Sequence, residues 1–259
     1  MSKKDERIKN MIELLQRRQG MTVKELATYF DVSEMTIRRD MKFLKDNQLM
    51  LDIPGAAVLN PNSSNAIVSD NYSIVTATIT QAREKERIGK YAASLIENDD
   101  CIIIDNGTTT EQLASSIPGH LRITVLTSNL NIVNQLAHKP NISIILAGGY
   151  YHPDTGMFES QESISLIKKT RAAKVFCSAA GVHETMGATC MNSYELETKW
   201  AIMGSGAQKI LLADSSKFGF VKSCYIGDIE FFDMIITDDK LSDEWKEIIR
   251  SKGVELVIV

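Results

Sequence analysis

The sequence predicts an α/β protein with two domains, a small N-terminal winged helix-turn-helix and a larger C-terminal Rossmann-like domain built on a parallel sheet. Three helical segments followed by a Pro-Gly turn predict the first domain. Short apolar strands that alternate with helices predict the second, because parallel strands are buried on both faces. We assign residues 1–59 to the winged helix-turn-helix, 60–82 to a polar linker and 83–259 to the parallel-sheet domain.

The first domain is expected to contain three helices with defined ends. Apolar residues at helical spacing over 5–18 predict the first helix. Thr22 and Glu25 stand in the order of a capping box, so a second helix begins there. Ser33 is placed to cap the third helix. The Pro-Gly pair at 54–55 separates two short apolar runs and predicts the wing.

The third predicted helix has the pattern of a helix that reads DNA. Ile37, Met41 and Leu44 share one face and would pack on a small core. An arginine guanidinium can donate two hydrogen bonds to a guanine edge or to a phosphate. Hydroxyl groups near a helix N-terminus can contact phosphates as well. The sequence does not decide which of the two arginines contacts a base. The ordinary alternative to a DNA-reading helix is a surface helix with charged side chains and no DNA contact. The side chains expected to contact DNA are Thr22, Ser33, Thr36, Arg38, Arg39 and Lys42.

Composition narrows the class of protein. The formal net charge of −4 excludes a protein that coats nucleic acid in bulk. Residues 1–55 carry eleven Lys and Arg against nine Asp and Glu, which is within ordinary variation but suits a DNA-reading domain. Four scattered cysteines without a Cys-x-x-Cys pair indicate free thiols rather than zinc ligands. We expect a cytoplasmic protein with no membrane segment, metal or other cofactor.

The second domain is expected to alternate strands and helices. The strands are predicted at 101–105, 123–127, 142–146, 175–180, 210–214, 234–237 and 254–259. An amphipathic helix through Ile88 and Leu95 precedes them, and the others are predicted at 109–116, 129–138, 159–169, 194–204 and 242–252. One further short strand is predicted near 74–75, within the linker.

Polar and glycine-rich turns follow most of these strands, at the edge where open parallel sheets bind ligands. Such turns supply helix amides, hydroxyls, carboxylates and a cation, which together suit a phosphorylated polyol. The residues expected to bind this ligand are Asp105, Asn106, Gly107, Thr108, Thr109, Thr127, Ser128, Asn129, Gly148, Gly149, Gly181, Glu195, Asp214 and Lys217.

Each of these residues also has an ordinary structural interpretation. Gly148 and Gly149 alone indicate a turn, and Asp105 alone could cap a helix. Glu195 and Lys199 lie four apart on one predicted helix, a spacing that without context indicates a solvent-exposed ion pair. The convergence of several polar turns on one sheet edge favours the ligand site.

The motifs resemble those of the DeoR family of bacterial sugar-metabolism regulators. The segment Val-Ser-Glu-Met-Thr-Ile-Arg-Arg-Asp at 32–40 matches the family's N-terminal signature. Asp-x-Gly-Thr-Thr from Asp105, Thr-Ser-Asn from Thr127 and Asp-Ser-Ser-Lys-Phe-Gly from Asp214 match its sensor domain. The wing departs from the family, because Leu-Asp-Ile-Pro-Gly-Ala-Ala at 51–57 lacks the usual Arg and His-Gly-Gly-Ala. The third helix should therefore carry more of the DNA affinity.

The resemblance implies a transcriptional repressor that binds double-stranded operator DNA as a homo-oligomer, a dimer or larger. It implies a sensor domain similar in fold to ribose-5-phosphate isomerase that binds a phosphorylated sugar. The segments 178–183 and 187–190 look closest to the branch that controls deoxynucleoside catabolism, which implies deoxyribose 5-phosphate as effector. Alternatives are a different sugar phosphate, a domain that serves only oligomerisation, and an isomerase using Glu195, Asp214 and Lys217.

Overall fold

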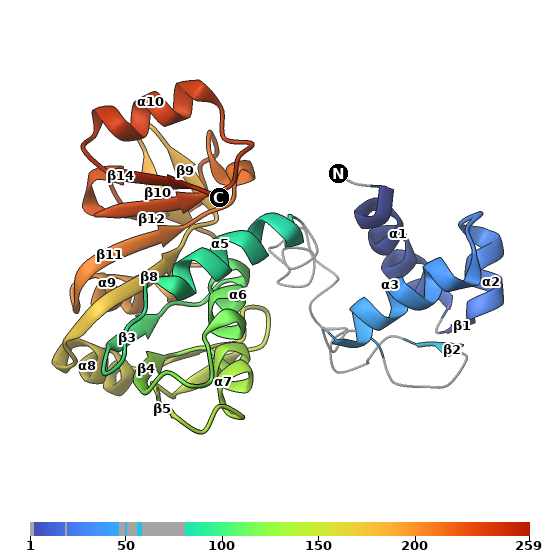
Figure 1. Ribbon diagram of the computed structural model, residues 1–259, viewed down its shortest axis with the longest axis horizontal. Coiled ribbons are helices and arrows are strands. Elements are labelled where there is room, and N and C mark those ends of the chain that lie inside the picture. The colour runs from blue at the N-terminus through green and yellow to red at the C-terminus, as the bar shows by residue number, and fades with distance from the viewer. Residues whose placement is uncertain (1–2, 19, 47–49, 51–55, 59–80) are drawn as a thin grey trace. The chain divides into compact units, whose positions relative to one another are not determined.

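The computed structural model describes residues 3–18, 20–46, 50, 56–58 and 81–259. Contacts divide the chain into two units, Met1–Thr80 and Gln81–Val259 (Figure 1). The Pro-Gly turn of the predicted wing and the short strand predicted near 74–75 lie outside the described residues. Among the described residues, no helix is long and apolar enough to span a bilayer.

The first unit contains the three predicted helices and a small antiparallel ladder. Its elements are α1 (Lys3–Arg18), β1 (Met21–Thr22), α2 (Val23–Tyr29), α3 (Glu34–Asp46) and β2 (Ala56–Ala57). The short strand β1, which the sequence did not predict, pairs with β2 and brings Met21 opposite Ala57. The ladder therefore ties the segment after the Pro-Gly pair to the start of α2.

Local capping fixes where α2 and α3 begin. The capping box is present, because the Glu25 amide donates to Thr22 Oγ1 at 3.2 Å and the Thr22 amide donates to Glu25 Oε2 at 2.7 Å. Ser33 caps α3 by accepting the Thr36 amide at 3.2 Å. The apolar face of α3 is buried as predicted, in a core that includes Ile8, Met11, Leu15, Leu26, Ile37, Met41 and Leu44.

A seven-stranded sheet organises the second unit, and each pair of neighbouring strands in it is parallel, as predicted. The order across the sheet is β14-β13-β11-β8-β3-β4-β5. The strands are β3 (Cys101–Ile104), β4 (Ile123–Thr127), β5 (Ile142–Leu146), β8 (Ala172–Ser178), β11 (Gly206–Leu212), β13 (Met234–Thr237) and β14 (Glu255–Ile258).

Helices cover both faces of this sheet (Figure 1). One face packs on α5 (Ala82–Ser94), α6 (Thr108–Ser116) and α7 (Leu130–Leu136), and the other on α8 (Gln161–Lys169), α9 (Leu196–Met203) and α10 (Asp243–Ser251). Successive strand residues serve opposite faces, since Ile102 and Ile104 join the first core and Ile103 the second. Helix α5 begins at Ala82, next to the predicted start of this domain at residue 83.

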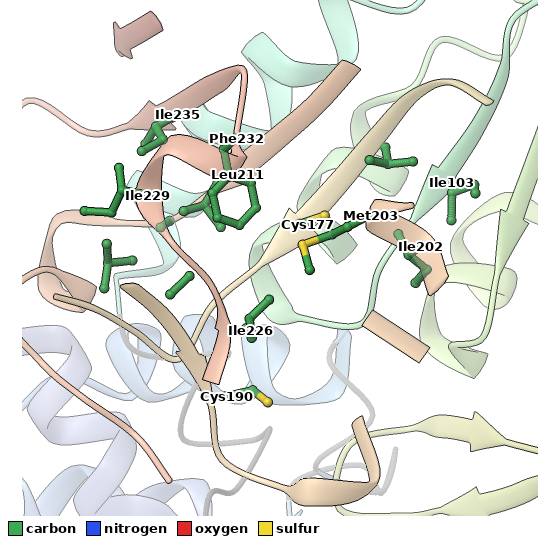
Figure 2. Close-up of a cluster of buried hydrophobic side chains, with 14 of the residues drawn as sticks. Ile103, Cys177, Cys190, Ile202, Met203, Leu211, Ile226, Ile229, Phe232 and Ile235 are labelled. Carbon is green, nitrogen blue, oxygen red and sulfur yellow. The ribbon is translucent and has the colours of Figure 1, made fainter. Parts of the chain in front are cut away.

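Short antiparallel strands, which the sequence did not predict, are added to the parallel sheet. A hairpin joins β6 (Tyr150–His152) to β7 (Met157–Glu159), and a small sheet has the order β12 (Cys224–Gly227), β10 (Gly187–Cys190), β9 (Gly181–His183). Three 3-10 turns complete the unit, at Ser193–Glu195, Ser215–Lys217 and Ile229–Phe231. Figure 2 shows where the two sheets meet, with Ile226 and Cys190 of the small sheet in the same buried cluster as Leu211 and Cys177 of the large one.

Candidate ligand site and DNA-contacting helix

The parallel sheet reverses its order between β3 and β8. The chain runs from β3 outward through β4 to β5, then returns to add β8 on the opposite side of β3. Asp105 directly follows β3 and Ser178 ends β8, so both lie at the carboxyl ends of these neighbouring strands. Open α/β sheets bind ligands in the crevice at such a reversal point. The fold therefore places Asp105 and its neighbours where a ligand is expected.

A buried group of charges occupies this position. Lys199 Nζ on α9 lies 2.5 Å from Asp105 Oδ2 and 3.7 Å from Glu195 Oε2. Asp105 is 1% exposed, Lys199 3% and Glu195 5%, so the pair at 195 and 199 is not the solvent-exposed bridge that its spacing suggests. Burial acts to lower the pKa of Lys199, but the carboxylates of Asp105 and Glu195 outweigh it and raise that pKa above its usual value.

Hydrogen bonds hold the two carboxylates in place and leave specific acceptors open. Glu195 accepts from Asn106 Nδ2 and from Asn192 Nδ2, each at 3.0 Å. Asp105 Oδ2 accepts the Ser178 amide at 3.0 Å. Within the described part of the chain, the buried atoms Asp105 Oδ1 and Asn106 Oδ1 have no hydrogen-bond partner. Such atoms are rare in folded proteins and would be satisfied by a ligand that carries hydroxyl donors.

The N-terminus of α6 opens beside these residues. Gly107 precedes it with a φ of 157°, and a Cβ there would lie 2.5 Å from Ser178 Oγ, so the chain passes close to β8. No side chain caps α6. By contrast α7 is capped by Asn129 Oδ1, which accepts the amides of Asn131 and Ile132. The first amides of α6 are therefore better placed to receive an anion.

The turn after β4 lies next to this helix start in the sheet order. The side chains of Thr127, Ser128 and Asn129 are fully buried there. Asn129 Nδ2 donates to the Thr155 carbonyl at 2.9 Å, so both polar atoms of that side chain serve the fold. Among the described residues, the Ser128 hydroxyl has no partner. Ser128 is the member of this turn with a polar group left for a ligand.

The three other predicted glycines differ in their surroundings, since a Cβ would clash at Gly149 and Gly181 but would meet open space at Gly148. A Cβ on Gly149 would lie 2.2 Å from the Glu159 carbonyl oxygen, because this glycine lets β6 approach β7. Gly148, just before it, accepts a hydrogen bond from Ser160 Oγ at 3.1 Å. The strand predicted to end near Gly181 ends at Ser178, and Gly181 begins β9. The expected place of Gly181 at the end of a parallel strand was therefore wrong.

A second buried charge cluster lies where α5 and α6 meet the end of β11. Lys85 Nζ is 4.0 Å from Asp214 Oδ2, and both side chains are buried. Burial lowers the pKa of Lys85 to about 8, although Asp214 partly offsets it. Burial also raises the pKa of Glu111 to about 7, against the hydrogen bond that Asn131 donates to it at 2.8 Å. The predicted cation Lys217 is partly exposed, and in the described residues its ammonium forms no ion pair.

Sequence reasoning did not include Lys85, Glu111 or Lys199 among the ligand-site residues. A signal for Lys85 was available, because positions 85, 88 and 92 share the apolar face of α5 and a lysine there must be buried. Glu111 carried no comparable signal, and Lys199 had only its spacing of four residues from Glu195, because the burial of both depends on which helices the sheet brings together.

The exposed face of α3 is continuous and cationic. Met35, Arg38, Arg39 and Lys42 are exposed at the spacing i, i+3, i+4 and i+7, which places them on one stripe opposite the buried face. Arg38 also lies 3.6 Å from Glu34, an exposed pair that DNA would compete with. Met35 is 61% exposed and was not predicted as a contact, although an apolar side chain here suits a thymine methyl group.

Of the predicted hydroxyl contacts, Thr22 and Ser33 are exposed and already serve as caps, and Thr36 is half-buried. Thr22 Oγ1 also donates to Glu25 Oε2 at 2.8 Å, and the hydroxyls of Ser33 and Thr36 lie 3.0 Å apart. The acidic end of the signature points inward instead, since Asp40 is buried and Arg7 Nε donates to its carboxylate at 2.6 Å. Asp40 therefore fastens α3 to α1, and the arginines before it face outward.

Together, a helix-turn-helix with a cationic helix face and a buried charge cluster at the reversal point of an α/β sheet are typical of ligand-responsive DNA-binding regulators. Residues 7–62 match the DeoR-like helix-turn-helix domain, and residues 80–239 match the DeoR C terminal sensor domain. The chain belongs to the DeoR family of transcription regulators.

Curated relatives resemble the chain over most of its length. It is 32% identical over 257 residues to the deoxyribose operon repressor of Escherichia coli, covering 99% of each protein. It is 33% identical over 253 residues to the regulator GolR of Listeria innocua, covering 98% of each. It is 32% identical over 236 residues to the glycerol-3-phosphate regulon repressor of Escherichia coli, covering 91% of each. These relatives are regulators by name, and the chain is a transcription regulator rather than an enzyme.

Among solved structures, ribose 5 phosphate isomerase A from Neisseria gonorrhoeae aligns with a TM-score of 0.40 at 15% identity, covering 54% of each chain. The initiation factor eIF-2B of Pyrococcus horikoshii aligns with a TM-score of 0.43 at 13% identity.

Proposed function

We propose that this protein is a cytoplasmic repressor that binds operator DNA through α3 and leaves it when a phosphorylated sugar, deoxyribose 5-phosphate, binds in the crevice between β3 and β8. The observation that carries the proposal is the buried Asp105–Lys199–Glu195 cluster with unpartnered acceptors beside the uncapped start of α6. Two relatives support the ligand class, since one is named for the deoxyribose operon and another for glycerol 3-phosphate.

Charge indicates how such a ligand would be oriented. Asp105 and Glu195 with one lysine leave a net charge of −1, which repels a phosphate group. The phosphate would therefore bind the amides at the start of α6, with Lys217 as the nearest predicted cation. The sugar hydroxyls would donate to Asp105 Oδ1 and Asn106 Oδ1, which have no other partner among the described residues.

Direct calorimetry tests the effector. Deoxyribose 5-phosphate is expected to bind the wild-type protein more tightly than ribose 5-phosphate, fructose 6-phosphate, glycerol 3-phosphate or inorganic phosphate. Asp105→Asn should weaken binding at least tenfold, because the hydroxyl acceptor loses its charge. Arg122→Ala is the control, since Arg122 is an exposed residue paired with Asp99. If the protein binds only a different sugar phosphate, the proposed identity of the effector is wrong. If it binds no sugar phosphate, the second domain is left with a role in oligomerisation only.

Operator binding tests the DNA half. We propose a dimer or larger homo-oligomer on double-stranded DNA, with half-sites about 34 Å or a multiple apart. Replacing the base-reading arginine, Arg38 or Arg39, by alanine should cost about 1–3 kcal/mol and relax specificity at one base pair. Replacing the second of these two arginines, which would contact phosphate, should weaken binding to all DNA sequences. It should also reduce by about one the slope of log binding constant against log salt concentration. If both variants bind DNA as Arg122→Ala does, α3 is not the contact surface.

Helix α5 is the element through which, along the chain, the proposed ligand site could be linked to the preceding unit. It is the first described helix of the second unit, and its Lys85 pairs with Asp214 in the loop that carries Lys217. A ligand that moves the 214–217 loop would therefore move the charge partner of α5. A coupling free energy of only about 1–3 kcal/mol would be enough for release.

A further inference from the structure

Two of the four cysteines lie directly opposite each other on neighbouring strands. Cys190 ends β10 and Cys224 begins β12, and the register of this antiparallel pair makes them partners. Opposed residues in an antiparallel pair project from the same face, with Cα atoms about 4.5–5.5 Å apart. A disulfide spans Cα separations of about 4.4–6.8 Å. The backbone therefore already has the spacing that a cross-strand disulfide needs.

The two thiols also share their surroundings. Cys190 Sγ donates to the Asn192 carbonyl at 3.7 Å, and Cys224 Sγ donates to the Met191 carbonyl at 3.8 Å. Both sulfurs thus contact consecutive peptide groups of the loop after β10. Both side chains belong to one hydrophobic cluster, in which Figure 2 shows Cys190 near Ile226. Cys190 is buried and Cys224 is half-buried, so a dissolved oxidant reaches Cys224 first.

We propose that Cys190 and Cys224 form a redox modification site that a hydroperoxide closes into a reversible cross-strand disulfide. The Cys224 sulfur attacks the peroxide O–O bond, giving a sulfenic acid and one water from hydrogen peroxide. In that first water the leaving hydroxide takes the proton of the Cys224 thiol. The Cys190 sulfur then displaces the sulfenic hydroxyl, which takes the proton of the Cys190 thiol and leaves as a second water. Two thiols lose two electrons and one peroxide gains them.

The order of these steps follows from the difference in burial. Burial raises the pKa of the Cys190 thiol to about 12, so this thiol is a poor first nucleophile and a slow resolving one. Closure is therefore expected over minutes to hours rather than seconds. Reduced thiols are the resting form in cytoplasm, where disulfides are usually transient and redox-sensing.

Closing the disulfide would disturb the ligand crevice. Both sulfurs would turn away from the carbonyls of Met191 and Asn192, and Asn192 holds Glu195 Oε1. Glu195 in turn orders Asn106 and pairs with Lys199. Oxidation should therefore loosen residues 191–195, and it should lower the affinity for the effector at least threefold, a second effect that rests on the proposed function.

The test treats the full-length protein with hydrogen peroxide and follows it by intact mass, peptide mapping and amide hydrogen exchange. The expected product lacks two hydrogen atoms, contains a peptide pair joined at Cys190 and Cys224, and exchanges faster over 191–199; dithiothreitol reverses all three. Cys190→Ser should stop at a sulfenic acid on Cys224 that dimedone traps. Cys101→Ser is the matched control, because Cys101 is also half-buried but lies on β3, and it should close the disulfide as wild type does.

Several results would overturn the proposal. Peroxide could leave the mass unchanged, add oxygen to Cys224 without a crosslink, or join two copies of the chain. A crosslink without faster exchange over 191–199 would remove the effect on the crevice. If the reduced protein binds no sugar phosphate, the proposed effector is wrong, while the mass and exchange results still decide the disulfide.

Discussion

Replacing Lys199 by methionine tests whether the buried charge cluster is held together by its single cation. The substitution keeps the length of the side chain but leaves Asp105 and Glu195, at 1% and 5% exposure, without a positive partner. Removing one partner of a buried ion pair typically costs about 3–5 kcal/mol, because the remaining charge stays desolvated. We expect a loss of this size in the free energy of unfolding of the second unit.

Tryptophan fluorescence in urea measures this change selectively. Both tryptophans of the chain, Trp200 and Trp245, lie in the second unit, so their emission reports on its unfolding alone. With a denaturant slope of about 2–3 kcal/mol/M, the urea midpoint should fall by about 1–2 M. Arg122→Ala removes an exposed pair and should leave the midpoint unchanged.

The double variant separates charge from packing. Lys199→Met with Asp105→Asn removes both members of the 2.5 Å pair and should recover a large part of the lost stability. A midpoint shift below about 0.3 M for Lys199→Met would refute the reasoning, because less than 1 kcal/mol would be at stake. An equal loss in the double variant would assign the effect to packing instead.

Three further outcomes are expected. Glu111→Gln should stabilise the second unit by about 1–3 kcal/mol at pH 7.5 but little at pH 4.5. Because folding raises the pKa of Glu111 from its ordinary value of 4.5 to about 7, the wild-type protein loses stability as the pH rises between those two values, and glutamine does not. A difference between the two proteins that does not depend on pH would contradict this. Thr22→Ala should cost about 1 kcal/mol in the first unit through loss of the cap, seen by circular dichroism but not by tryptophan emission. Asp40→Ala should cost about 2–4 kcal/mol there by leaving Arg7 without its partner, and unchanged circular dichroism melting would contradict it.

The parts of the fold that depend on local pattern could be predicted from the sequence. The capping box at Thr22, the cap at Ser33 and the buried stripe of α3 follow from spacing alone. The mostly apolar runs that became β4, β5 and β13 have the predicted bounds, and β4 and β13 are almost fully buried, as expected of strands covered on both faces. The antiparallel strands β9, β10 and β12 were missed, since each is short, rich in small residues and stabilised by its neighbours.

Predicting the ligand site required knowing which segments meet. Asp105, Asn106 and Glu195 were predicted and do lie together. The pairing of Asp105 with Lys199 spans 94 positions and depends on α9 crossing the end of β8, which no local pattern encodes. The spacing of four residues between Glu195 and Lys199 is the same whether the pair faces solvent or the edge of a sheet, so the sequence does not reveal that the pair is buried.

The most direct test of the account is operator binding followed by fluorescence anisotropy during titration with deoxyribose 5-phosphate at one stated salt concentration. The DNA would come from upstream of the genes for deoxynucleoside catabolism in the source organism. The account predicts tight binding that this compound reverses in the wild type and not in Asp105→Asn, while ribose 5-phosphate and inorganic phosphate leave the complex intact. Tight binding that no sugar phosphate changes, or equal release of the Asp105→Asn complex, would contradict it.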